Sequence, residues 1–210
     1  MSHEERTAKY REQREAHYER LFGPMHEYVF HSTDIKQVHI DVYQFPPTKD
    51  RPYWTLITGG MSDERQLLLE PDTHRSPRAE IIMYVREPKR WMFNDMKILA
   101  EFPFDENTVL HWWHTVPIGV PINRQKSDLN AYFFLPPYFE NPELSKLKID
   151  GDGVDFLWMQ PITEAERAFA QTKGSDELEK VIRKANLPIV LNEYRKSLIR
   201  QLPFGLLLKR

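Results

Sequence analysis

A strand–loop–strand pattern in the first third of the chain constrains the fold more than any other feature. Apolar and polar side chains alternate over residues 38–43, so the two kinds point to opposite faces of one strand. Three prolines within residues 46–52 cannot donate hydrogen bonds to a sheet and therefore belong to a connection. A second β-prone run, residues 53–58, is stopped by Gly59 and Gly60. The pattern predicts two strands joined by a proline-rich loop.

The remaining segments favour an α+β order, because strands come first and helices collect at the two ends. Ser2 with Glu5, and Thr163 with Glu166, have the spacing of helix capping boxes. The further predicted strands are residues 78–86, 129–135, 147–149 and 154–162. The predicted helices are residues 2–22, 88–102, 105–110, 163–174, 175–186 and 188–202. We expect the first helix to pack only by its last turns, Pro88 to lie in a first helical turn and Pro103 to end that helix.

Composition excludes several classes of function. The chain has 29 Lys and Arg against 31 Asp and Glu, a balance that argues against phosphate-driven nucleic-acid binding. It has no cysteine, so disulfides, zinc thiolate sites and a cysteine nucleophile are excluded. The charged N-terminal segment contains no apolar signal core, and no stretch approaches the length of a membrane span. We expect a cytoplasmic protein that uses neither membrane nor nucleic acid.

Four polar residues form the strongest candidate for a metal site. His39 and Asp41 share a strand face, and His111 and His114 form an HxxH pair. Together they predict, as an alternative function, a metal-dependent hydrolase. The favoured interpretation is a hydrogen-bonded cluster of His39, Asp41 and Tyr43 that fixes the register of the strand.

The sequence from Gly59 to Asp63 admits two interpretations. Paired glycines after a strand let a ligand approach the backbone, and Ser62 has the chemistry of a nucleophile. No GxSxG or phosphate-loop motif accompanies it. We therefore favour a structural role, with unusual backbone angles at Gly59 and Gly60 and with Ser62 and Asp63 bonded to local amides. Glu80, on the third strand, is expected to pair with Arg78 or Lys97 or to be exposed.

Aromatic residues predict a binding surface near residues 113–121, because Trp and Tyr beside Arg are typical of interface hot spots. No residue is assigned a catalytic role. The candidate binding residues are His39, Asp41, Tyr43, Trp54, Gly59, Gly60, Ser62, Asp63, Trp113 and His114.

Four blocks of the sequence resemble the suppressor-of-fused domain family, in its small bacterial form, over residues 38–182. The blocks, in family order, are HIDVYQFPPTKDRPYWTLITGGMSD (39–63), RAEIIMYV (78–85), WHTVPIG (113–119) with YFFLPP (132–137), and FLWMQPITEAERAFAQTKGSDELEKV (156–181). The resemblance implies one α+β domain with a mixed, mostly antiparallel sheet flanked by helices and with helical termini. Residues 31–186 would form this domain, residues 1–30 a helical extension, and residues 187–210 a helix and tail packed on it.

The resemblance also implies a function of binding rather than catalysis. Family members in animals bind a peptide of a transcription factor, and small bacterial members resemble immunity proteins that neutralise secreted toxins. We accordingly expect a protein partner, a toxin in the narrower form of the hypothesis, with no cofactor and no enzymatic activity. Either a monomer or a homodimer, held by the terminal helices, is compatible with the sequence.

Overall fold

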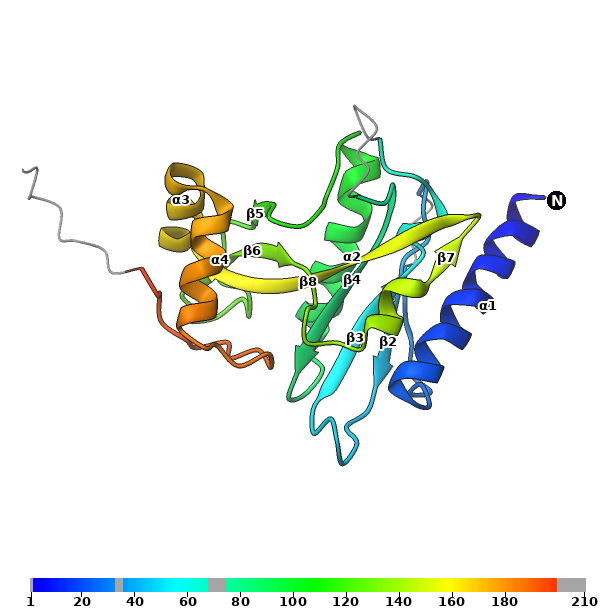
Figure 1. The fold of residues 1–210 in the computed structure, drawn as a ribbon, viewed down its shortest axis with the longest axis horizontal. Helices are drawn as coiled ribbons and strands as arrows, with labels where there is room; N and C mark the ends of the chain where they lie inside the picture. Colours follow the sequence, from blue (N-terminus) through cyan, green and yellow to red (C-terminus); the bar gives the residue numbers. More distant parts are fainter. Residues whose placement is uncertain (1, 33–35, 68–74, 200–210) are drawn as a thin grey trace, which may run out of the picture.

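The computed structural model describes residues 2–32, 36–67 and 75–199 and contains one mixed sheet flanked by helices (Figure 1). The strand order is β1-β2-β3-β4-β8-β6-β5, and β7 pairs with β8 off this path. Every pairing is antiparallel except that of β4 with β8. The predicted α+β class and mostly antiparallel sheet are confirmed.

The elements have the following bounds. The strands are β1 (Phe30–His31), β2 (Asp41–Phe45), β3 (Trp54–Gly59), β4 (Arg78–Val85), β5 (Thr115–Pro117), β6 (Leu129–Leu135), β7 (Lys148–Ile149) and β8 (Asp152–Thr163). The helices are α1 (His3–Phe22), α2 (Arg90–Asp105), α3 (Glu164–Lys173) and α4 (Ser175–Lys184), with short 3₁₀ helices η1 (Met61–Asp63) and η2 (Pro142–Lys146). Within the described ranges, none of these helices combines the length and apolarity needed to cross a membrane.

Two apolar layers cover the two faces of the sheet. Strand β4 is buried throughout and contributes to both layers, with Ile81 on one face and Ile82 on the other. Helix α2 packs in the layer of Ile81, while α1 and α4 pack in the layer of Ile82. On the latter face α1 lies at one end of the sheet and α3 with α4 at the other (Figure 1). Between them, the chain from the end of β6 to β7, which includes η2, covers this face.

Local sequence signals explain several boundaries. Both predicted capping boxes are present, at Ser2 with Glu5 and at Thr163 with Glu166. The β7–β8 hairpin turns through Asp150 and Gly151, which have φ of 52° and 86°. Positive φ at both central residues suits the twist of a two-residue hairpin turn.

Helix α1 packs along more of its length than predicted. Its buried residues recur every fourth position, at Tyr10, Arg14, Tyr18 and Phe22, and so form one stripe along the helix. Because one member of the stripe is an arginine, the spacing of apolar side chains alone does not reveal it. The prediction that this helix packs only by its last turns is wrong.

Other helix predictions also need correction. Helix α2 begins after Pro88, at Arg90, and continues past Pro103 because a proline in the last turn removes only one hydrogen bond. No helix follows over residues 106–110. The predicted helix from residue 188 is absent from residues 187–199, where the amide of Leu191 donates instead to the carbonyl of Tyr84 (2.9 Å). Residues 200–210, including the apolar tail, lie outside the described part of the chain.

Candidate functional site

A buried carboxylate on β4 organises the junction between β3 and η1. The Glu80 side chain has no solvent exposure. One of its oxygens accepts hydrogen bonds from the amides of Gly60 (3.1 Å) and Ser62 (3.0 Å) and from the Ser62 hydroxyl (2.6 Å). Its other oxygen accepts from the Thr58 hydroxyl (2.7 Å). These four bonds replace the water that the carboxylate loses on burial.

Arg14 supplies the positive charge opposite this carboxylate. Its Nε lies 3.8 Å from Glu80 Oε1, and its Nη1 donates to Asp63 Oδ1. Burial raises the pKa of Glu80 and of Asp63, and the Arg14 guanidinium opposes the rise in both. Arg78, a predicted partner of Glu80, bonds instead to the carbonyl oxygens of Ser62 (2.7 Å) and Asp63 (2.8 Å). The network ties α1 to the sheet.

Of the two interpretations of Gly59–Asp63, the geometry supports the favoured structural one, because the segment is closed and buried. Gly60 has φ of 107°, and a Cβ there would lie 1.9 Å from the carbonyl oxygen of His39. A Cβ on Gly59 would meet the ring of Tyr43 at 2.4 Å. Ser62 is fully buried, so no substrate reaches its hydroxyl. Its bond to Glu80, and that of Asp63 to Arg14, correct the expectation that both residues bond to local amides.

The four predicted metal ligands do not form one cluster. His39 and Asp41 lie together, with His39 Nε2 3.2 Å from Asp41 Oδ1, but their neighbour is His31 rather than His111 or His114. The imidazole Nδ1 of His31 lies 2.7 Å from the same carboxylate oxygen. Sequence analysis missed His31, whose contact with Asp41 depends on the pairing of β1 with β2.

His111 and His114 belong to a second, buried arrangement. The fully buried His111 places Nε2 2.8 Å from Asp155 Oδ2, and its own amide donates to His114 Nδ1 (3.3 Å). Burial lowers the pKa of His114, and the charges of Arg75 and His111 lower it further. With His111 paired to Asp155, this HxxH segment has a structural role.

Tyr43 and Trp54 also have structural contacts. The Tyr43 hydroxyl donates to Glu15 of α1 (3.0 Å) and so does not join the predicted cluster with His39 and Asp41. Trp54 is half-buried at the start of β3, where its ring meets His26 edge to face at 5.5 Å.

An exposed surface extends from Trp113, across charged side chains of α4, to Tyr138. Trp113 is 38% exposed, and its indole N–H donates to Glu179 of α4 (2.6 Å). Glu179 also accepts from Nε of Arg183 (2.9 Å), whose guanidinium carbon lies 3.9 Å from the ring centroid of Tyr138. This chain of contacts holds an exposed arginine over an aromatic face in a fixed geometry.

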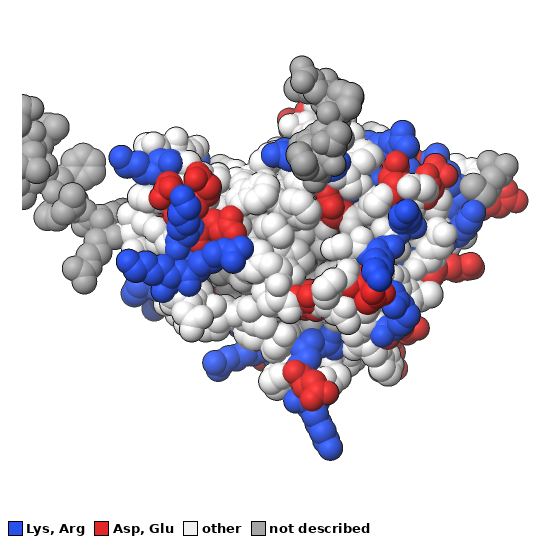
Figure 2. Space-filling view, in the orientation of Figure 1, with Lys and Arg blue, Asp and Glu red and all other residues white. Residues whose placement is uncertain are grey.

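Behind this rim lies a groove of about 280 Å³, which we call the α4 groove. Its floor is Trp158 of β8, which is 4% exposed. Phe139 and Tyr138 meet that indole edge to face, at centroid distances of 4.9 and 6.1 Å, and are themselves 36% and 43% exposed. The remaining lining residues are Ile182, Arg183, Asn186, Leu187 and Ile189. Between the charged side chains on α4 and those on α1, Figure 2 shows a largely uncharged stretch of surface.

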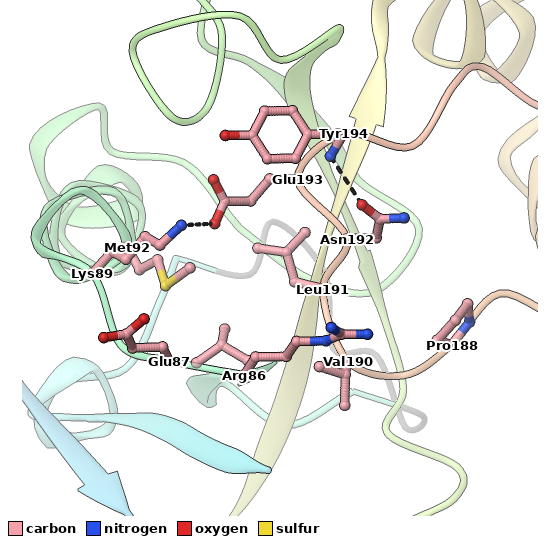
Figure 3. A pocket seen from close by; sticks show the side chains of 11 residues that line it. Arg86, Glu87, Lys89, Met92, Pro188, Val190, Leu191, Asn192, Glu193 and Tyr194 are labelled. Carbon is pink, nitrogen blue, oxygen red and sulfur yellow. Dashed lines mark hydrogen bonds and ion pairs between the residues drawn. The ribbon is translucent and has the colours of Figure 1, made fainter.

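A separate pocket of about 490 Å³ lies where residues 188–194 pass the end of β4 and the start of α2 (Figure 3). Its apolar lining includes Met92 and Leu191. Two of its four charged lining residues, Lys89 and Glu193, already form an ion pair across it (Figure 3). A ligand would have to displace that pair, which makes the pocket a weaker candidate than the α4 groove.

Sequence comparison identifies the family. Residues 36–196 match the family model described as suppressor of fused protein (SUFU). A search of curated proteins gives no significant match.

Solved structures of low sequence identity share the fold. A SUFU homologue from Neisseria gonorrhoeae FA 1090 is 20% identical with a TM-score of 0.74, and the alignment covers 93% of this chain and 100% of that one. A chain of the Sufu–Fu complex is 15% identical with a TM-score of 0.58, and 92% of each chain is covered. Drosophila Suppressor of Fused is 16% identical with a TM-score of 0.55, and the alignment covers 76% of this chain but 42% of that one. With the family model matching most of its length, this chain belongs to the suppressor of fused family.

Proposed function

We propose that this chain is a non-enzymatic protein whose function is to bind another protein, and that the α4 groove is its binding surface. The observation that carries the proposal is the exposure of Tyr138 and Phe139 beside Arg183. Tyrosine and arginine at the edge of a well-packed apolar floor are the residues that dominate binding energy in protein interfaces. Because the ion pair with Glu179 already orders the Arg183 side chain, partner binding would cost little additional side-chain entropy.

Family membership supports the same proposal. One of the structures that share this fold is that of a Sufu–Fu complex, in which the related chain is bound to another protein. Similarity of fold alone does not identify the partner of this chain. In the narrower form of the proposal the partner is a cognate toxin, and the chain acts as an immunity protein that covers the active surface of that toxin.

The test compares the proteins that the wild-type chain and its variants retain from the same lysate. The wild-type chain and the variants Tyr138→Ala, Arg183→Ala and Tyr28→Ala would each be immobilised and exposed to lysate of the source cells. Tyr28 is the matched control, because it is also an exposed tyrosine, at 58%, but it does not line the α4 groove. We expect one stoichiometric protein to be retained by wild type and Tyr28→Ala and lost from both groove variants. Equal retention by all four chains would contradict the proposed surface.

The narrower proposal needs a separate measurement. The captured protein would be expressed alone and together with each variant in a host that lacks it. We expect it to inhibit growth, and co-expression of wild type, but not of Tyr138→Ala, to restore growth. A captured protein without toxicity would contradict the immunity role and leave the binding role intact.

A further inference from the structure

Two imidazoles and a carboxylate converge at the outer edge of the sheet. His31 of β1 is the register partner of Asp41 on β2, and His39 precedes Asp41 by two residues. The distances from Asp41 Oδ1 are 2.7 Å to His31 Nδ1 and 3.2 Å to His39 Nε2. One ligand atom from each residue lies within 4.8 Å of the other two. In the part of the chain that the structure describes, it is the one group of three or more His, Asp or Glu residues with such convergence.

This donor set suits a transition-metal ion. Neutral imidazole nitrogen and carboxylate oxygen are ligands of zinc, at about 2.0–2.1 Å from the metal. In a tetrahedral site, ligands at that distance are roughly 3.3 Å apart. The His39–Asp41 distance already has this value, and the His31–Asp41 distance must open by about half an ångström. The two imidazoles can make this adjustment, since their side chains are 63% and 53% exposed.

The carboxylate is the least exposed of the three candidate ligands. The side chain of Asp41 is only 9% exposed, while both histidines are turned to solvent. The two imidazoles are stacked, with centroids 6.4 Å apart and ring planes at 28°, so both present a nitrogen to the same carboxylate oxygen. The fixed ligand therefore lies on β2, and the two adjustable ligands lie on the solvent side, where an ion enters.

We propose that His31, His39 and Asp41 bind one zinc ion, with water completing the coordination. The consequence is local: β1 is only two residues long and pairs with β2 through two residue pairs. Besides these pairs, β1 is held by the stacking of Phe30 on Phe93, with ring centroids 5.6 Å apart. An ion shared by β1 and β2 would fix the short strand to the sheet.

The test is zinc binding by the untagged full chain, measured by competition with a chromogenic chelator, with cobalt absorption as a second readout. We expect one equivalent of zinc to bind the wild-type chain, and His31→Ala and His39→Ala each to weaken binding at least about tenfold. Asp41→Asn keeps the shape of the side chain but removes its charge, and it should weaken binding as well. The matched controls are His26→Ala and His111→Gln, which should bind as wild type does.

Two results would overturn the proposal. One is the absence of zinc binding by the wild-type chain at millimolar zinc, and the other is unchanged binding in the double variant His31→Ala with His39→Ala. Both histidines are exposed, so these variants should retain the fold, which circular dichroism would verify. Cobalt provides an independent check, because its visible absorption bands should appear with wild type and be lost with the double variant.

Discussion

Replacement of Arg14 by methionine tests whether the buried network stabilises the fold. Methionine keeps most of the length and apolar contact of the arginine stem but leaves Glu80 and Asp63 without their cation. Removing one partner from a buried ion pair costs about 3–5 kcal/mol. Glu80 keeps four hydrogen bonds from Thr58, Gly60 and Ser62, so we expect the lower end, about 3 kcal/mol. For a chain of this size that corresponds to a fall in Tm of about 6–12 °C.

The assay is urea unfolding followed by tryptophan fluorescence, with Arg20→Met as the matched control. Arg20 lies on the same helix and also forms an ion pair, with Glu143 at 3.5 Å, but its side chain is 53% exposed. Exposed pairs contribute about 0–1 kcal/mol, so the control should unfold almost as wild type does. Equal destabilisation by Arg14→Met and Arg20→Met would refute the reasoning.

Acidification gives a second, independent check on Arg14→Met. Burial raises the folded-state pKa of Glu80 above the ordinary value of 4.5, and loss of Arg14 raises it further. As the pH falls toward 4.5, the folded chain then takes up this proton before the unfolded chain does, so this group favours the folded state. The difference in stability between Arg14→Met and wild type should therefore shrink on acidification. The double variant Arg14→Met with Glu80→Gln lacks the buried carboxylate charge. At neutral pH its stability should therefore be closer to that of wild type than the stability of Arg14→Met alone.

Three further predictions follow from single contacts. Gly60→Ala should lower stability by about 3 kcal/mol or prevent folding, because its Cβ would meet the carbonyl of His39 at a positive φ; thermal unfolding measures this. Thr163→Ala should cost about 1 kcal/mol in urea unfolding, through loss of the cap on α3, and Thr163→Ser should not. His114 has a lowered pKa, so the unfolded chain takes up its proton first, and His114→Gln should reduce the loss of stability as the pH falls through 6.5; an unchanged pH profile would contradict this.

Periodic patterns predicted the framework of the fold because each depends only on neighbouring residues. The strand predicted at residues 78–86 and the capping box at Ser2 are of this kind, and both are confirmed. Predictions were wrong where a hydrogen-bond partner far away in the sequence determined the local structure. Residues 188–199 have apolar residues at helical spacing, yet Leu191 bonds to the end of β4. Periodicity cannot reveal such a competing acceptor.

The candidate sites were harder to predict because their residues are far apart in the chain. The cation opposite Glu80 comes from α1, 66 residues earlier, and an arginine in a charged helix gives no sign that it is buried. His31 joins His39 and Asp41 only through the pairing of β1 with β2. The α4 groove combines Tyr138 and Phe139, Trp158 of β8 and Arg183 of α4. Among the residues at the rim of the groove, the sequence singled out only Trp113, because aromatic residues surround it in the chain.

The buried network and the α4 groove are connected through the architecture of one sheet face. Helix α1 covers one end of this face, fixed by Arg14, and α3 with α4 covers the other end (Figure 1). Between them Trp158 is covered by side chains of the loop after β6, Tyr138 and Phe139. Because helices hold both ends, the aromatic groups in the middle can stay partly exposed without loss of the core beneath them. A rigid, partly exposed aromatic surface of this kind favours binding, since its residues are ordered before the partner arrives.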